Sequence, residues 1–241
     1  MGSTQKNVMK KPKQNVTKLA HNINKQSPSS YTQKAEKMMK KKPVEQTIGK
    51  PVEDKDDGTF KLVPPRDPRV NSAIAPFTDD MLKEHGIKDR KELADRMFKT
   101  MLKYGGIGLT ANQVGLPFNM FVLGAHEHIE KGLKMACFNP MIISKGEEEV
   151  MMKEGCLTFP FVFLGITRPR KVIVKYTDEN GDLQEGHLDG VVSRVFQHEY
   201  DHIMGKNMTD LVSKMKLDMA YKKAEKQMKA YQKHKEAMQN L

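Results

Sequence analysis

The 241-residue chain has no tryptophan, only two cysteines and no long apolar run. No stretch approaches the 18 consecutive apolar residues of a transmembrane helix, so we expect no membrane contact. The N-terminus lacks the short apolar segment of a secretory signal. A chain with so few cysteines is typical of a reducing compartment, where Cys137 and Cys156 stay free or bind a metal. We therefore expect a cytoplasmic protein.

Positive charge is concentrated at the two ends of the chain. Residues 1–50 contain 12 lysines, no arginine and two acidic residues, and residues 206–241 contain nine lysines and four acidic residues. The two ends therefore carry +10 and +5, and since the whole chain carries +11, residues 51–205 carry −4. This asymmetry predicts a near-neutral domain with basic ends that suit an anionic partner.

Composition divides the chain into three regions. Residues 1–55 are rich in Lys, Gln, Asn and Ser, and a segment with so few apolar side chains is expected to be a disordered basic extension. An organelle-targeting peptide is the alternative, although such peptides favour arginine. Residues 56–209 should form the folded domain, and residues 210–241 a basic C-terminal helix.

Periodicity predicts the secondary structure of the folded part. Thr78–Lys103 is helical in pattern, with Thr78 as a possible N-cap and Gly86 as an internal stop. From residue 108 to residue 189 the chain has short β-rich runs at 119–125, 134–143 and 170–186, and the last contains the hairpin signal Asn180-Gly181. A buried helix should end at Gly205.

The final helix should carry one apolar stripe with lysines on its other faces. The stripe consists of Leu217, Tyr221, Ala224, Met228, Tyr231 and Met238. This order of elements predicts an α+β fold in which antiparallel β-sheets pack around a central helix, with an N-terminal helix and a C-terminal amphipathic helix.

The stretch "VFQHEYDHIMG" contains two histidines four residues apart, His198 and His202. On a helix these side chains share one face and can bind one metal ion. Glu199 lies one step around the helix, where it can reach a reacting water without binding the metal. The alternative is an ordinary helix whose histidines are satisfied by polar partners.

A catalytic metal site needs a third protein ligand and an open position. The candidates are His126, His128, His187, His234 and Cys156. Cys156 stands in "KEGCLTFP", a turn-like setting unlike that of a core cysteine, whereas Cys137 in "MACFNP" resembles ordinary core.

The stretch "YGGIGLTANQVG" offers a backbone that a ligand can approach closely. Gln113 within it is a neutral amide donor that suits a developing oxyanion. The alternative interpretation is a helix C-cap and turn followed by an ordinary strand.

Together these stretches resemble the peptide deformylase family. "GIGLTANQ" (Gly106–Gln113), "EGCLT" (Glu154–Thr158) and "QHEYDH" (Gln197–His202) are similar to its three motifs in order and spacing, and the resemblance covers about residues 60–210. It implies a metal-dependent hydrolase that removes the N-formyl group from the N-terminal formyl-methionine of nascent polypeptides and releases formate. The implied metal ligands are Cys156, His198 and His202, around one divalent ion that is Fe(II) in the cell and replaceable by zinc or nickel.

The resemblance also assigns roles to residues around the metal. It implies that Glu199 carries the proton, and that Gln113 and the backbone N–H of Leu157 hold the oxyanion. Substrate binding falls to the backbone of Gly106, Ile107 and Gly108, and Val195 should line the methionine pocket. Asp201 is expected beside the ligands, and a buried Glu154–Arg168 pair is expected to fix the cysteine loop.

One segment departs from the family pattern. Many bacterial members carry an arginine a few residues beyond the cysteine, whereas residues 159–165 here are uncharged. The expected partners are nascent formyl-methionyl peptides and, through the basic ends, the ribosome, with the enzyme acting as a monomer.

Two other functions are compatible with parts of the sequence. The first is an HExxH zinc endopeptidase, whose third ligand would come from Glu225, His234 or Glu236 downstream. The second is a basic ribosome- or RNA-associated protein without catalysis.

Overall fold

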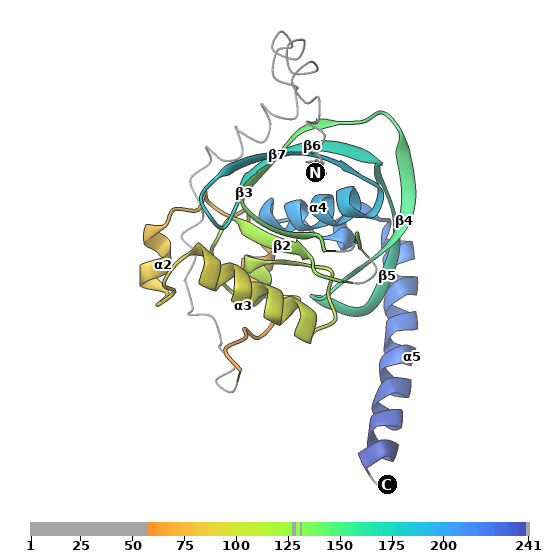
Figure 1. Cartoon of the computed structure of the whole chain (residues 1–241). Helices are drawn as coiled ribbons and strands as arrows, with labels where there is room; N and C mark the ends of the chain where they lie inside the picture. The colour runs from red at the N-terminus through yellow and green to blue at the C-terminus, as the bar shows by residue number, and fades with distance from the viewer. Residues whose placement is uncertain (1–56, 127–128, 131, 240–241) are drawn as a thin grey trace, which may run out of the picture.

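The computed structural model describes residues 57–126, 129–130 and 132–239, shown in colour in Figure 1. Residues 1–55, which are predicted to be disordered, and the candidate ligand His128 are outside the described residues. None of the described helices combines the length and the apolar character that crossing a membrane requires.

Two antiparallel sheets form most of the domain, as the sequence predicts. The larger sheet has the strand order β1-β2-β3-β6-β7 and the smaller one pairs β4 with β5. The strands of the larger sheet are β1 (Gly108–Thr110), β2 (Met120–Gly124), β3 (Lys134–Lys145), β6 (Lys171–Thr177) and β7 (Leu183–Asp189). Those of the smaller sheet are β4 (Glu149–Cys156) and β5 (Phe159–Pro169).

The central helix α4 (Gly190–Ile203) is wrapped by these strands in Figure 1. Its apolar face packs on the larger sheet, where the rings of Phe196 and Phe121 meet edge to face at a centroid distance of 4.9 Å. The helix ends as predicted, since Gly205 follows with φ +69°. Because most of α4 is buried, most of its polar side chains must find partners inside the protein.

The predicted N-terminal helical segment is two helices, α2 (Asp80–Glu84) and α3 (Arg90–Lys103). The N-cap of α2 is Asp79 and not Thr78, while the carboxylate of Asp89 caps α3 by accepting from the backbone N–H of Glu92. The chain between them turns at Gly86, the predicted stop, which has φ +67°. Leu93, Met97 and Met101 of α3 lie in the core, the role that their spacing predicts.

The two hairpins differ in how well the sequence predicts them. β6 and β7 are joined through Asn180-Gly181, with Gly181 at φ +91°, as expected. The strands β4 and β5 are absent from the prediction, which treats "KEGCLTFP" only as a turn. In the structure the turn contains just Leu157 and Thr158, and the flanking residues pair from Glu149 with Pro169 to Cys156 with Phe159.

The C-terminal helix α5 (Lys214–Gln239) begins four residues later than predicted, because a 3-10 turn, η3 (Met208–Leu211), comes first. Its first half packs on the domain against β5, and the ring of Tyr231 in its second half lies 5.8 Å from that of Phe161 on β5. The end of the helix extends away from the body (Figure 1). The predicted apolar stripe is therefore only partly buried. Ala224 is buried and Leu217 half-buried, whereas the other four members are exposed, namely Tyr221, Met228, Tyr231 and Met238.

Candidate active site

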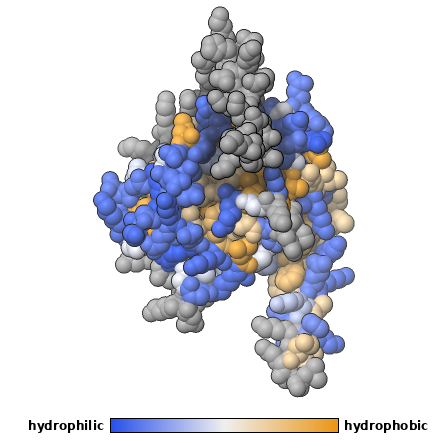
Figure 2. Space-filling view, in the orientation of Figure 1, coloured by the Kyte–Doolittle hydropathy of each residue, from blue (hydrophilic) through white to orange (hydrophobic). Residues whose placement is uncertain are grey.

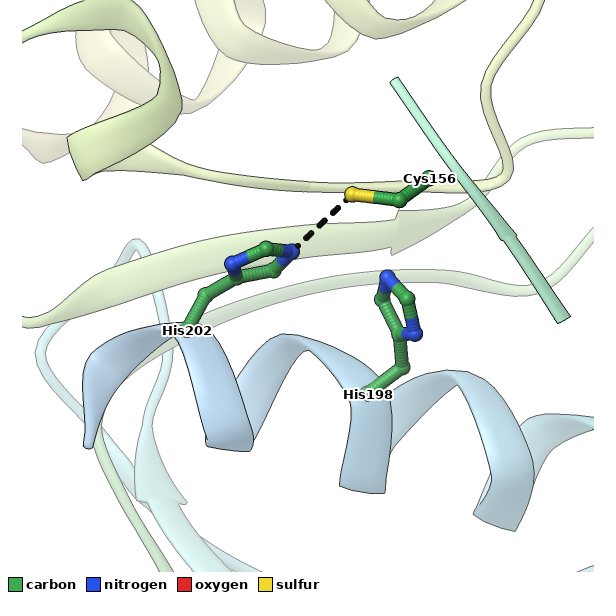
Figure 3. Close-up of side chains that lie close together, drawn as sticks. All are labelled: Cys156, His198 and His202. Carbon is green, nitrogen blue, oxygen red and sulfur yellow. Dashed lines mark hydrogen bonds between the residues drawn. The ribbon is translucent and has the colours of Figure 1, made fainter. Parts of the chain in front are cut away.

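Three potential metal ligands meet at the end of β4 and on one face of α4. The donor atoms of Cys156, His198 and His202 all lie within 4.8 Å of one another, and Figure 3 shows their side chains converging. The thiol sulphur of Cys156 lies 3.2 Å from Nε2 of His202. One thiolate and two imidazoles form a donor set that iron, nickel and zinc all accept, so these residues fit a divalent transition metal.

The other candidate ligands lie elsewhere. His187 is exposed on β7, His126 belongs to the loop after β2, and His234 is exposed on α5. The downstream acids that an endopeptidase would need are also on α5, where Glu225 pairs with Lys229 at 2.7 Å and is solvent-exposed.

Electrostatics favour an ionised cysteine. Burial opposes the charged form of the Cys156 thiol, but the neighbouring His202 and His198 lower its pKa well below the usual range. A thiolate is the form that binds metal ions. The site therefore supplies the donor in its reactive state.

Glu154 connects His198 to a buried network of charged side chains. Its Oε2 lies 2.9 Å from Nδ1 of His198, and its Oε1 accepts at 2.7 Å from Arg168 and at 2.9 Å from Arg194. Burial opposes ionisation of Glu154, but His198 and Arg168 hold the pKa of this carboxyl well below its usual value. A carboxylate in this position fixes the ring orientation of a ligating histidine.

The expected Glu154–Arg168 pair is thus present, and Arg168 also contacts Asp201 at 2.5 Å. Arg194 was not predicted. It precedes His198 by four residues and so lies on the same helix face, which is the signal that identifies it. Arg194 also donates to the backbone carbonyls of Ile166 and Val150, and so connects α4 to the smaller sheet.

Glu199 is held against β1. Its side chain is buried, and Thr110 Oγ1 donates to its Oε2 at 2.7 Å. Burial raises the pKa of Glu199, while His198 and His202 oppose the rise. A Cβ added to Gly108 would lie 2.4 Å from Oε1 of Glu199, so glycine at that position leaves the room that the carboxylate occupies. Thr110 was not predicted, because nothing in its local sequence points to Glu199.

Gln113 lies beside the cysteine, in the 3-10 helix η2 (Ala111–Val114). Its Oε1 accepts from the backbone N–H of Thr110 at 2.8 Å. Its Nε2 donates to Thr158 Oγ1 at 2.9 Å and reaches Cys156 Sγ at 3.5 Å. The amide is therefore fixed by both of its ends, with its donor side facing the proposed metal ligands.

These residues surround a cavity of about 820 Å³. Its lining includes nine of the ten residues that the sequence analysis assigns to catalysis, substrate binding or metal binding, and His202 is the exception. The lining also contains mostly apolar residues that were not predicted as part of the site, namely Leu62, Tyr104, Met152, Val191 and the segment from Phe159 to Phe163.

The Cys-His-His donor set, with a buried glutamate and a fixed amide donor beside it, fits the site of a metal-dependent hydrolase. Residues 67–218 match the family model described as "Polypeptide deformylase". A peptide deformylase of Mesorhizobium japonicum is 39% identical over 136 residues, which cover 56% of this chain and 77% of that protein. One of Erythrobacter litoralis is 34% identical over 187 residues, covering 68% and 94%.

Solved structures agree with these sequence relatives. The crystal structure of an Ehrlichia chaffeensis peptide deformylase with actinonin has 34% identity and a TM-score of 0.60, covering 70% of this chain and 97% of that one. The chain belongs to the peptide deformylase family. It is therefore a metal-dependent hydrolase that removes N-formyl groups, as its three motifs predict.

Proposed function

We propose that Cys156, His198 and His202 hold one divalent metal ion beside which the formyl group of nascent formyl-methionyl peptides is hydrolysed. The observation that carries the proposal is the meeting of these three donors within 4.8 Å of one another. We further propose Fe(II) as the native ion, with zinc or nickel able to replace it, because all three accept mixed thiolate and imidazole ligands.

The side chains around the metal have separate tasks. A bound ion would supply Lewis-acid polarisation of the formyl carbonyl and of a water molecule. Glu199 accepts the proton that the attacking water loses and delivers it to the amine as the C–N bond breaks, which leaves formate and a free N-terminus. Gln113 Nε2 and the backbone N–H of Leu157 donate to the oxyanion. Thr110 holds Glu199 in place through its 2.7 Å hydrogen bond.

The peptide binds as an added strand along the backbone of Gly106, Ile107 and Gly108. Side chains at the two glycines would meet neighbours that close the cavity: Leu157 Cδ1 lies 2.7 Å from a Cβ built at Gly106, and Val195 Cγ1 lies 2.8 Å from one at Gly108. Val195 lies in the apolar lining, where it contributes to the methionine pocket.

We place this activity in the cytoplasm, in a monomer that meets its substrates at the ribosome. The exposed second half of α5 carries lysines that suit phosphate contacts. Binding to purified ribosomes should weaken steeply with salt and disappear when residues 210–241 are removed. Association that is unaffected by either change would contradict this part of the proposal.

Formate release from formyl-Met-Ala-Ser under anaerobic conditions tests the activity. Metal-replete protein should release formate and leave casein intact. Replacing Cys156 by Ala should remove both the metal and the activity, whereas Ala at Cys137, which is buried in β3 away from the site, should retain both. A folded, metal-loaded protein that releases no formate, or a Cys156→Ala variant that keeps its metal and cleaves casein, rules the proposal out.

A further inference from the structure

A second hollow adjoins the catalytic cavity and is not explained by the reaction. It is a groove of about 280 Å³ between β5 and the first half of α5, and we call it the distal groove. Its lining comprises Phe163, Leu164, Gly165, Val212, Lys216, Met219, Ala220 and Lys223. Phe163 lines both the groove and the catalytic cavity, so its side chain borders both hollows.

Phe163 is placed to contact a ligand that passes from one hollow to the other. It is 51% exposed, and its ring lies against Gly155, the residue before Cys156. Met219, farther along the groove, is 66% exposed. Figure 2 shows apolar side chains gathered over β5 and the start of α5. Neighbouring apolar side chains that are exposed to solvent in this way are typical of an interaction surface.

The exposed charged side chains that line the two hollows are all lysines. The ammonium group of Lys153 lies 4.9 Å from the Phe163 ring centroid, and Lys216 and Lys223 line the groove with exposed side chains. Lys216 and Lys223 are seven residues apart and so lie on one face of α5. Within the described part of the chain, neither takes part in an ion pair. The acidic residues among the described lining of both hollows are Glu154 and Glu199, which are buried inside the catalytic site.

We propose that the distal groove binds the downstream part of the substrate peptide and selects acidic residues there. An apolar side chain would pack on Phe163 and Met219, and carboxylates would pair with Lys216 and Lys223. This inference rests on the proposed function, because the peptide must begin in the catalytic cavity. An extended chain advances about 3.3 Å per residue, so each added residue carries the peptide farther from the catalytic cavity, and longer peptides are the ones that test the groove.

Kinetics with longer peptides test the inference. The substrates are a series of formyl-methionyl octapeptides in which an Asp-Asp pair is moved one position at a time from the fourth residue to the end. Each peptide is compared with one that has Lys-Lys at the same two positions. At one or more positions the acidic peptide should have a KM about fivefold lower than its basic match, with equal kcat, as expected for two exposed ion pairs. Equal KM values at every position would overturn the inference, while continued hydrolysis of formyl-Met-Ala-Ser would leave the proposed function intact.

Paired variants then locate the preference. Lys216→Glu combined with Lys223→Glu should abolish or reverse the preference for acidic peptides and leave hydrolysis of formyl-Met-Ala-Ser unchanged. The matched control is Lys226→Glu with Lys233→Glu, which makes the same charge change at the same spacing on α5, outside the groove lining. A preference that survives the first pair, or that both pairs remove equally, would contradict the assignment.

Phosphate groups of RNA are the competing occupant of these lysines. If the Lys216 and Lys223 substitutions weaken ribosome binding but leave the KM of every octapeptide unchanged, the groove serves RNA and the peptide assignment is wrong. If no formylated peptide of any length is hydrolysed, the proposed function and this inference fail together.

Discussion

Replacing Thr110 by Val should slow hydrolysis while leaving the metal site intact. The Thr110 hydroxyl donates to Glu199 Oε2 at 2.7 Å, and both side chains are buried, so water cannot replace the bond. A hydrogen bond to a charged group contributes about 1.5–3 kcal/mol. Since about 1.4 kcal/mol is a factor of ten in rate, kcat should fall by about 10- to 150-fold.

The assay is formate release from formyl-Met-Ala-Ser at matched metal content. Thr110→Ser keeps the hydroxyl and should restore most of kcat. Thr100→Val is the control, because Thr100 is equally buried but donates to the carbonyl of Arg96 within α3, away from the site. It should lower stability without lowering kcat.

A Thr110→Val variant whose kcat stays within about threefold of wild type would refute the assigned role of this bond. Equal kcat losses in the Thr110 and Thr100 variants would also refute it, because the effect would then report on general loosening of the fold.

Three further substitutions have expected outcomes. Gly108→Ala places a Cβ 2.4 Å from Glu199 Oε1 and should reduce kcat/KM by about 10- to 100-fold through overpacking. Gly146→Ala is the control, because its Cβ meets only ordinary contacts, and it should have no effect. Equal activity in the two variants would contradict the geometry at Gly108. Glu154→Gln weakens the hydrogen bond that supports His198 and should lower metal affinity by about 10- to 100-fold in a chelator competition. Glu148→Gln, at an exposed position, is its control. Unchanged affinity in Glu154→Gln would contradict the supporting role of Glu154. Leu93→Ala, at a fully buried position, should lower the urea unfolding free energy by about 2–5 kcal/mol, and the exposed Leu102→Ala on the same helix by far less; similar losses would contradict the assigned core.

The part of the site that follows from local geometry could be predicted. On any helix, His198 and His202 share a face with Glu199 beside them, so sequence spacing alone specifies their arrangement. Cys156 could not be placed in this way, because it reaches His202 only through the pairing of β4 with β5 and the docking of both on α4. The resemblance between three separated motifs and one family supplied that missing tertiary information.

The strand β4 illustrates why part of the fold escaped prediction. Its sequence, "EVMMKEGC", is rich in Glu, Met, Lys and Gly, which have weak strand preference. Its conformation comes instead from its partner β5, whose Val162, Leu164 and Ile166 face the core in strict alternation.

The buried residues Thr110 and Arg194 were not predicted as part of the site for a related reason. Each is explained by the carboxylate that it contacts, and those contacts join segments 89 and 40 residues apart. A polar residue within an apolar stretch indicates that a partner exists, but only the folded chain shows which one.

Metal titration of the metal-free protein tests the central claim most directly. Fe(II) added anaerobically should restore formate release in proportion to bound metal, with a sharp end point at one ion per chain, and His202→Ala should lose both the end point and the activity. Full formate release by metal-free protein, or an unchanged end point in the His202 variant, would contradict a catalytic metal held by Cys156, His198 and His202.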